Sequence, residues 1–333
     1  LGAHLVANAG LARGEVASHD LGGGGDDVED LDGRGGRAGE DEGAAKGVSR
    51  AGIEGGGDQD SIDAIHGGSL ALPIYPQGRA PGVKSGEMIP IYEHADVRRM
   101  LYSMKSLVDA SRAICYANAV AYDLAHSAPD DETRNHAKAM EELLTPLSKG
   151  WSTDRANDVT SLGVQVHGGM GYIEETGAAQ HMRDARIAAI YEGTNGIQAI
   201  DLVARKMMDG GEMANRLMDE IEEQAERARA SHPNMAEAVW QACESLREAT
   251  DWLAGQTDLD DRFAGAVPYL KAFARVLGGH FHLGAAMADP GGAREKLARF
   301  YITRMLPEHS GLLAAATAGA DGTFALSLDE LAG

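Results

Sequence analysis

One glutamate between an aromatic residue and a glycine is the strongest candidate for chemistry in this sequence. Residues 190–198 read IYEGTNGIQ, with Glu192 before Gly193 and apolar residues on both sides. Such a carboxylate can be a solvated loop acid, a helix cap or a base. Apolar neighbours would raise its pKa, as a base for a weakly acidic C–H bond requires. Because most glutamates are solvated, Glu192 taken alone favours the loop acid.

A glycine-rich segment, HGGMGY, covers residues 167–172. Three closely spaced glycines let a backbone approach a phosphate and direct its amides toward it. The segment is not a dinucleotide-binding fingerprint, because GxGxxG is absent and no βαβ pattern surrounds it. Taken alone, it favours a turn at the end of a helix, since glycine mostly marks turns.

The histidines and cysteines predict no metal site and no disulfide. His280 and His282 are two positions apart, which places them on different faces of a helix, and no HxxxH pattern supports them. Cys115 and Cys243 are the two cysteines, and neither belongs to a partner motif, so both are expected to be core thiols. Two cysteines without a disulfide framework suit a reducing compartment, and we expect a cytoplasmic protein.

The composition excludes several classes of partner. The chain has 333 residues, a formal charge of −21 and 44% hydrophobic residues, so a sizeable core is possible. The negative charge argues against nucleic-acid binding, which usually needs a basic surface. No apolar run is long enough to span a membrane, and no secretion signal opens the sequence. We therefore expect a soluble protein without a membrane or nucleic-acid partner.

The composition changes sharply between residues 70 and 80. Residues 21–43, LGGGGDDVEDLDGRGGRAGEDEG, are rich in glycine and acid with no apolar period, and no aromatic residue precedes Tyr75. Such a segment cannot bury enough apolar surface to offset its chain entropy. Residues 1–76 are therefore expected to be low-complexity sequence that is either disordered or not native coding sequence.

The remainder is predicted to be all-α. Amphipathic periods predict helices over residues 95–125, 136–168, 178–190, 196–208, 219–230, 235–255, 268–288 and 293–317. Asp96 is a candidate N-cap for the first helix, and Pro146 could kink or divide the second. These elements predict a helical bundle over residues 77–208 and a helical extension domain over 209–333.

The motifs of residues 147–205 become specific when they are taken together. QVHGGMGY (165–172) is followed by MRDARI (182–187) and IYEGTN (190–195). In this order and at this spacing they resemble the C-terminal catalytic segment of acyl-CoA dehydrogenases. QGRAPG and IPIYEHADVRRML, within residues 77–101, resemble the entry to the same domain. The tail from residue 210 resembles the extra helical domain of the branch that includes 3-methylmercaptopropionyl-CoA dehydrogenases.

The resemblance implies FAD-dependent oxidation of an acyl-CoA thioester to a 2-enoyl-CoA. It implies that Glu192 removes the pro-R α-proton while a β-hydride moves to the flavin N5. The backbone N–H of this glutamate and a flavin ribityl hydroxyl would polarise the thioester carbonyl. Gly193 would lie against the substrate.

The resemblance also assigns cofactor contacts and partners. Positions expected to touch FAD are Thr194, Asn195 and Gly196. Positions expected to contact the FAD of a neighbouring subunit are Gln165, Val166, His167, Gly168 and Gly169. The second set implies a homo-oligomer, either a dimer or a tetramer, and the family implies an electron-transfer flavoprotein as electron acceptor.

Two departures from the family pattern support an alternative. A full member carries an N-terminal helical domain and a middle β-domain that supplies much of the flavin site, whereas residues 1–70 show no strand pattern. IYPQG (74–78) has Tyr75 near the place where the family tends to carry an arginine. The alternative is a truncated, non-catalytic helical or oligomerisation remnant. A DNA-associated relative of the same fold is disfavoured by the charge and by the absence of a basic tail.

Overall fold

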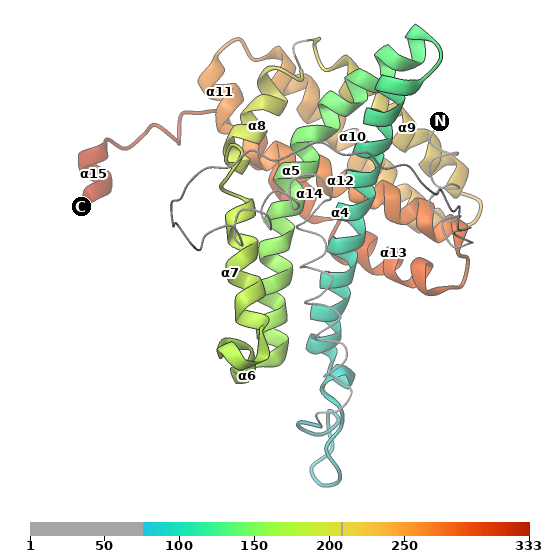
Figure 1. The fold of residues 1–333 in the computed structure, drawn as a ribbon, viewed down its shortest axis with the longest axis vertical. Coiled ribbons are helices and arrows are strands. Elements are labelled where there is room, and N and C mark those ends of the chain that lie inside the picture. Colours follow the sequence, from blue (N-terminus) through green and yellow to red (C-terminus); the bar gives the residue numbers. More distant parts are fainter. Residues whose placement is uncertain (1–75, 208) are drawn as a thin grey trace, which may run out of the picture. The chain divides into compact units, whose positions relative to one another are not determined.

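The computed structural model describes residues 76–207 and 209–333, which form an all-α fold (Figure 1). Within these residues the β-type pairing is limited to an isolated antiparallel bridge between Pro76 and Pro90. The all-α fold class predicted from the sequence is confirmed. The predicted disorder of residues 1–70 and the departure at Tyr75 lie outside the described residues.

Two long antiparallel helices position the candidate site. A 3₁₀ turn, η2 (Ile91–Glu93), precedes α4 (Ala95–Ser127), and a short connection leads into α5 (Asp131–His167). The connection ends at Asp130, whose carboxylate accepts a hydrogen bond from the Thr133 backbone N–H and so caps α5. This cap allows α5 to begin earlier than the sequence pattern predicted.

The chain then returns along α5. One short turn, α6 (Gly169–Tyr172), and a 3₁₀ turn, η3 (Glu174–Thr176), lead into α7 (Ala178–Ala188), which packs on α5. The next helix is α8 (Asn195–Ala204). The candidate glutamate lies in the connection between α7 and α8.

The second half of the chain adds seven helices within residues 209–333. They are α9 (Glu212–Ala228), α10 (Pro233–Gly255), α11 (Leu259–Ala264), α12 (Ala266–Ala288), α13 (Ala293–Arg304), α14 (Glu308–Ala316) and α15 (Leu328–Ala332). Helix α12 packs against α8, α10, α13 and α14, and also against α4 and α5.

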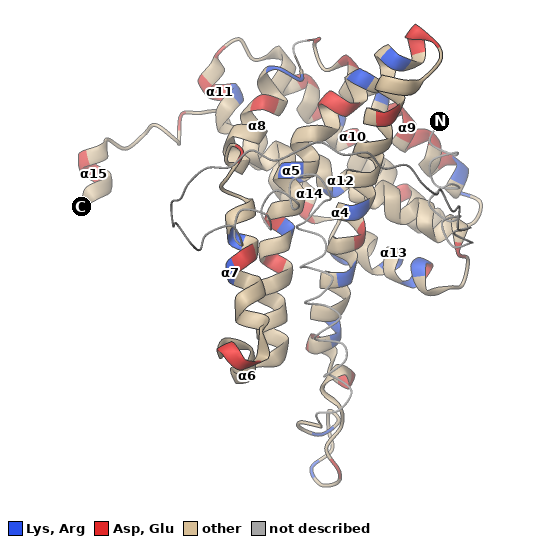
Figure 2. Ribbon diagram, in the orientation of Figure 1, with Lys and Arg blue, Asp and Glu red and all other residues tan. Residues whose placement is uncertain are grey.

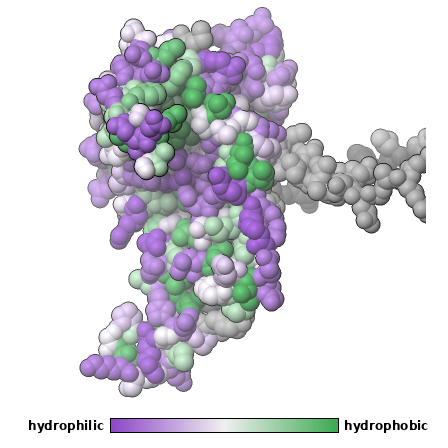
Figure 3. All heavy atoms as spheres, turned by 90° about the vertical axis from the view of Figure 1, so that its left-hand side faces the viewer, coloured by the Kyte–Doolittle hydropathy of each residue, from purple (hydrophilic) through white to green (hydrophobic). Residues whose placement is uncertain are grey.

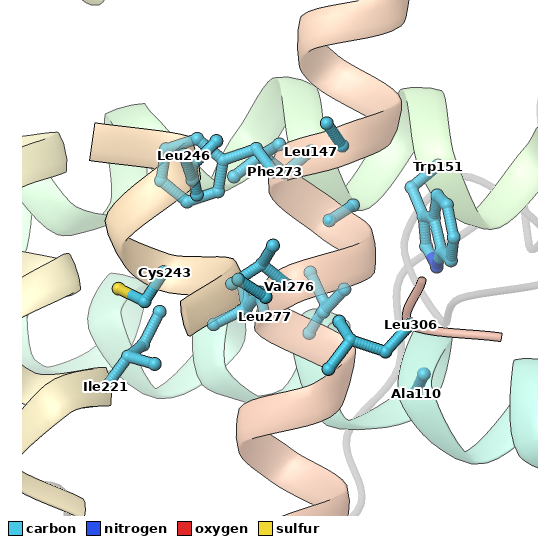
Figure 4. Close-up of a cluster of buried hydrophobic side chains, with 14 of the residues drawn as sticks. Ala110, Leu147, Trp151, Ile221, Cys243, Leu246, Phe273, Val276, Leu277 and Leu306 are labelled. Carbon is cyan, nitrogen blue, oxygen red and sulfur yellow. The ribbon is translucent and has the colours of Figure 1, made fainter. Parts of the chain in front are cut away.

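Helix α12 is the centre of the core. Most of its residues are apolar or small, and buried residues occur on every side of it, which is typical of a helix enclosed by others. Figure 4 shows Phe273, Val276 and Leu277 of α12 with side chains of α9 and α10 on one side and Trp151 of α5 on the other. One buried apolar cluster includes residues from both predicted helical domains. Their separation into two domains at residue 208 stays a prediction.

Close packing in this core depends on a glycine. A Cβ atom at Gly278 would lie 2.3 Å from the Tyr301 hydroxyl oxygen. That hydroxyl is buried and donates to the Arg275 carbonyl oxygen at 3.0 Å. The Tyr301 ring also stacks on His282, with ring centroids 4.4 Å apart. Helices α12 and α13 therefore approach each other at a position where only glycine fits.

Two expectations about helix boundaries are wrong. Asp96 does not cap α4: the N-cap is His94, and Asp96 pairs with Arg99 at 2.7 Å. The segment 293–317 is not one helix, because Pro307 separates α13 from α14. Proline lacks the N–H that would continue the hydrogen-bond ladder of α13.

Pro146 does not divide the second predicted helix. It is buried in the middle of α5, and the helix continues on both sides of it. Packing against neighbouring helices therefore outweighs the one hydrogen bond that a proline removes.

Candidate functional site

The connection that carries Glu192 has an unusual backbone. After α7 ends, Glu192 has φ +57° and Gly193 has φ +83°. Among the described residues, Glu192 is the one non-glycine with a positive φ. Two consecutive left-handed residues reverse the chain, and Thr194 then caps α8 by accepting a hydrogen bond from the Ile197 N–H. A side chain larger than hydrogen is strained in this conformation.

The side chain of Glu192 is exposed. It makes no ion pair or hydrogen bond with the described residues, and none of them accepts a hydrogen bond from its backbone N–H. The described residues therefore do not provide the apolar enclosure expected for a base. They leave both a carboxylate and an N–H donor available at the same position.

A polar network on α5 holds this connection. The Lys149 ammonium donates to the Gly193 carbonyl oxygen at 2.8 Å and to Asn195 Oδ1 at 3.0 Å. Asn195 Nδ2 donates to Asp154 Oδ1 at 2.7 Å and to Thr153 Oγ1 at 2.9 Å. The Asn195 backbone N–H closes the turn by donating to the Ala189 carbonyl oxygen at 3.3 Å. Asn195, predicted as a cofactor contact, is thus a structural anchor of the turn in this structure.

The electrostatics of the network follow from its partial burial. Burial lowers the pKa of Lys149, while the nearby charges of Glu192 and Asp154 act in the opposite direction. Burial also raises the pKa of the neighbouring Tyr191 hydroxyl, and Glu192 adds to this effect. The turn therefore brings one ammonium and two carboxylates close enough to interact.

The second predicted set lies at the end of α5. Val166 is buried, His167 is half-buried and bonds the Gly163 carbonyl oxygen through Nδ1 at 2.7 Å, and Gln165 is exposed. Gly168 ends the helix with φ 63° and ψ −143°, a combination that is almost restricted to glycine. A Cβ atom at Gly168 or Gly169 would meet nothing within 4 Å. The two glycines therefore present an open backbone surface.

The structure does not bring the two sets together within one chain. Lys149 fixes the Glu192 turn to the middle of α5, whereas Gln165 lies near its end. At 1.5 Å per residue, these positions are about 24 Å apart along the helix. Gly193, Thr194 and Gly196 lie with Glu192, while Gly168 and Gly169 lie at the far end.

Three residues that hold the turn were not predicted from the sequence. Lys149, Thr153 and Asp154 lie on one face of α5, at spacings of four and five residues. Their shared face on a helix that is polar along much of its length is the signal that could have found them. Polar rows of this kind usually face solvent, so the signal is weak without the fold.

The described part of the chain contains neither a cluster of metal-ligating side chains nor a helix that could cross a membrane. No group of three or more His, Cys, Asp or Glu side chains there could hold a metal ion. No helix in residues 76–207 and 209–333 has both the length and the apolar character needed to cross a membrane. Figure 2 shows acidic and basic residues mixed along most of the helices rather than gathered on one basic segment.

Large apolar side chains are exposed around α6, α7 and the turn. Figure 3 shows apolar side chains at several places on the face that includes α7 and α8. The exposed set comprises Met170, Tyr172, Ile173, Met182, Ile187, Ile190 and Ile197. Seven large exposed apolar side chains within residues 170–197 are typical of a region that packs against another protein surface.

Comparisons with known proteins match the same residues. Residues 85–208 match the family model described as acyl-CoA dehydrogenase, C-terminal domain, and residues 217–327 match the model described as acetyl-CoA dehydrogenase C-terminal like. Over 201 residues the chain is 44% identical to 3-methylmercaptopropionyl-CoA dehydrogenase of Ruegeria pomeroyi, covering 58% of this chain and 34% of that protein. Over 276 residues it is 31% identical to a butyryl-CoA dehydrogenase of Syntrophomonas wolfei, covering 75% and 45%. The matched region thus spans less than half the length of these relatives.

Solved structures agree on the fold. An acyl-CoA dehydrogenase from Bacillus anthracis, complexed with FAD, superposes with a TM-score of 0.62 at 16% identity, covering 81% of this chain and 48% of that one. ACDH-11 of Caenorhabditis elegans, in complex with C11-CoA, gives 0.59 at 17% identity, covering 75% and 42%. The two family matches and the identity to curated relatives show that the chain belongs to the acyl-CoA dehydrogenase family and contains its C-terminal helical portion.

Proposed function

We propose that this chain carries the proton-abstracting part of an FAD-dependent acyl-CoA dehydrogenase, with Glu192 as the base. The observation that carries the proposal is the left-handed conformation of Glu192, which presents on one turn an exposed carboxylate and a backbone N–H that no described residue accepts from. An α-proton next to a thioester needs both a base and a donor to the carbonyl oxygen. One residue offers both groups.

The chemistry of the turn follows from these two groups. The Glu192 N–H donates to the thioester oxygen and stabilises the negative charge that develops there. The carboxylate accepts the α-proton, and a Cα–Cβ double bond forms as the β-hydride leaves. When bound, FAD supplies the acceptor for that hydride. Gly193, which has no side chain, leaves room for the acyl group beside the base.

The residues present fit part of a flavin site. Gly168 and Gly169 offer open backbone that a large planar or phosphorylated group can approach. Thr194, Asn195 and Gly196 lie at the start of α8, where the positive end of the helix dipole favours an anionic ligand. Gln165, Val166 and His167 complete the proposed contacts to the FAD of a neighbouring subunit.

The separation of the two sets supports a homo-oligomer. Positions about 24 Å apart on one helix reach one flavin more easily when they come from two subunits. The exposed apolar side chains around α6 and α7 give such an assembly, a dimer or a tetramer, a surface to bury. Within the same proposal, the substrate is an acyl-CoA, the electron acceptor is an electron-transfer flavoprotein and the compartment is the cytoplasm. The division into residues 77–208 and 209–333 belongs to this proposal too.

A non-catalytic helical remnant is the second candidate. The observation in its favour is that the described residues contain no strand beyond the bridge of Pro76 and Pro90, whereas the family's flavin site draws on a β-domain. Glu192 has no evident structural role that would keep it in a strained conformation in such a remnant.

The visible spectrum of the purified chain with added FAD, and then with an acyl-CoA, tests the proposal. A bound flavin that bleaches on addition of acyl-CoA supports it. Glu192→Gln is expected to keep the flavin spectrum and to slow bleaching by about 10² to 10⁴-fold, because the amide accepts no proton. Glu175→Gln, at an exposed position on η3, is the matched control and should bleach normally. Unchanged bleaching in Glu192→Gln would refute the base, and no flavin binding would favour the remnant.

A further inference from the structure

We propose that Lys149 is the positioning residue of this site: its ammonium holds the left-handed turn so that the Glu192 carboxylate and N–H face the substrate. The catalytic meaning of this inference rests on the proposed function. The structural claim, that one lysine on α5 fixes the turn, rests on the contacts alone.

The contacts place one ammonium across the turn. Lys149 Nζ donates to the Gly193 carbonyl, directly after Glu192, and to the Asn195 side chain, at the first residue of α8. These two acceptors lie on either side of Thr194, so the ammonium fixes the chain where it leaves the left-handed pair. The other contact to the pair is longer, from Gln198 Nε2 to the Glu192 carbonyl oxygen at 3.4 Å.

Neighbouring residues on α5 orient the second acceptor. Asp154 and Thr153 accept from the Asn195 amide nitrogen, which turns its oxygen toward Lys149. The Thr153 hydroxyl in turn donates to the Lys149 carbonyl oxygen at 2.7 Å. The amide is therefore held at both ends, and the lysine meets a fixed acceptor rather than a mobile one.

A lysine suits this position for physical reasons. Hydrogen bonds from a charged donor are stronger than neutral ones, and partial burial strengthens them further. The ammonium carries three donors, so one side chain can serve two acceptors at once. The left-handed conformation of Glu192 is unfavourable by itself and persists only where surrounding contacts determine it. Lys149 supplies the strongest such contact among the described residues.

Hydrogen exchange of the turn in the full chain, without flavin or substrate, tests the inference. In Lys149→Met the backbone N–H groups of Asn195 and Gln198 should exchange about 10- to 100-fold faster, the loss expected when a hydrogen bond to a charged group is removed. Exchange in α9 to α12 should not change. Lys206→Met is the matched control, because Lys206 is also half-buried but pairs with Glu142 at 3.5 Å, away from the turn.

A chemical rescue separates the ammonium from general packing. Lys149→Cys in a Cys115→Ser background is measured before and after alkylation with 2-bromoethylamine, which rebuilds an ammonium at nearly the reach of lysine. Cys243 is fully buried and serves as the internal unreactive thiol. Restored protection of the turn supports the inference. Protection that stays lost after complete alkylation overturns it, as does unchanged protection in Lys149→Met.

A second variant applies if the first one is unfolded. If Lys149→Met does not fold, Lys149→Gln, which keeps an amide donor without the charge, should show an intermediate loss of protection; native protection there refutes the role of the charge. Because the exchange measurement involves no turnover, a chain that binds no flavin can still confirm or refute the positioning of the turn by Lys149. Failure of the proposed function is read separately, from the flavin spectrum.

Discussion

Glu192 is held in a backbone conformation that costs free energy. A non-glycine residue in the left-handed region is disfavoured by roughly 1–2 kcal/mol. Glycine or asparagine would satisfy the same turn with less strain. A glutamate at φ +57° is therefore poorly explained by stability, and its exposed carboxylate suggests a reason to keep it.

Glu192→Gly should make the protein more stable than Glu192→Ala by about 0.5–1 kcal/mol. Both substitutions remove the carboxylate, but only glycine relieves the left-handed strain, and part of that gain is offset by glycine's greater freedom in the unfolded chain. Urea unfolding of the two variants measures the difference. Equal stability, or a less stable glycine variant, would show that the turn is not strained.

The sequence predicted the candidate base and cofactor contacts better than the residues that hold the turn in place. Glu192, Gly168 and Gly169 belong to short motifs whose spacing is specific. Lys149 belongs to none, because its acceptors are 44 and 46 residues away along the chain and become neighbours only when α7 returns along α5. The sequence also could not show that Asn195 faces α5 rather than solvent.

At the scale of elements, apolar periodicity predicted most helices, missed the break at Pro307 and left the effect of Pro146 open. Pro307 ends a helix, whereas Pro146 is enclosed by packing and leaves α5 continuous. The two prolines differ in tertiary surroundings, which local sequence does not contain. Gly278 and Gly279 of α12 have a low helix propensity and would by themselves weaken the helix. Here their lack of a side chain leaves room for Tyr301 and Leu306 to pack against α12.

Gly278→Ala should destabilise the protein by about 1–3 kcal/mol, because its Cβ atom would overlap the buried Tyr301 hydroxyl. Combining it with Tyr301→Phe should cost less than the sum of the two single changes, since phenylalanine lacks the hydroxyl that makes the closest contact. Chemical unfolding of the parent protein, the two single variants and the double variant measures this coupling. Gly311→Ala is the control of opposite sign: it lies in the exposed part of α14 with nothing within 4 Å, and should stabilise slightly. Strict additivity of the first pair would contradict the packing described.

At the scale of the whole molecule, two histidines are enclosed in the core. Burial lowers the pKa of His280 to about 4, with a smaller effect from nearby Arg227. Burial also lowers the pKa of His282, while its bond with the Ser106 carbonyl oxygen acts in the opposite direction. The native state therefore keeps both imidazoles neutral at a pH where the unfolded chain would protonate them.

Stability should fall as the pH drops from about 6.5 toward 4. Above 6.5 neither state binds the His280 proton; between 6.5 and 4 the unfolded state binds it and the native state does not, so unfolding is favoured by up to about 3 kcal/mol. Urea unfolding at pH 7 and pH 5 measures the slope. His280→Phe should reduce that slope, and an unchanged slope in the variant would show that His280 does not contribute.

The central position of α12 also has a consequence for how the chain folds during synthesis. His282 forms a hydrogen bond with the Ser106 carbonyl oxygen, 176 residues earlier in the sequence. Helices α4 and α5 pack against α12, which is synthesised long after them. At translation speeds of 5–20 residues per second, the earlier helices wait roughly 10 to 35 s with their apolar stripes uncovered. Nascent chains arrested before residue 266 should therefore be digested by protease along α4 and α5, and those arrested well beyond α14 should resist. This interval is when the polypeptide most needs protection by a chaperone.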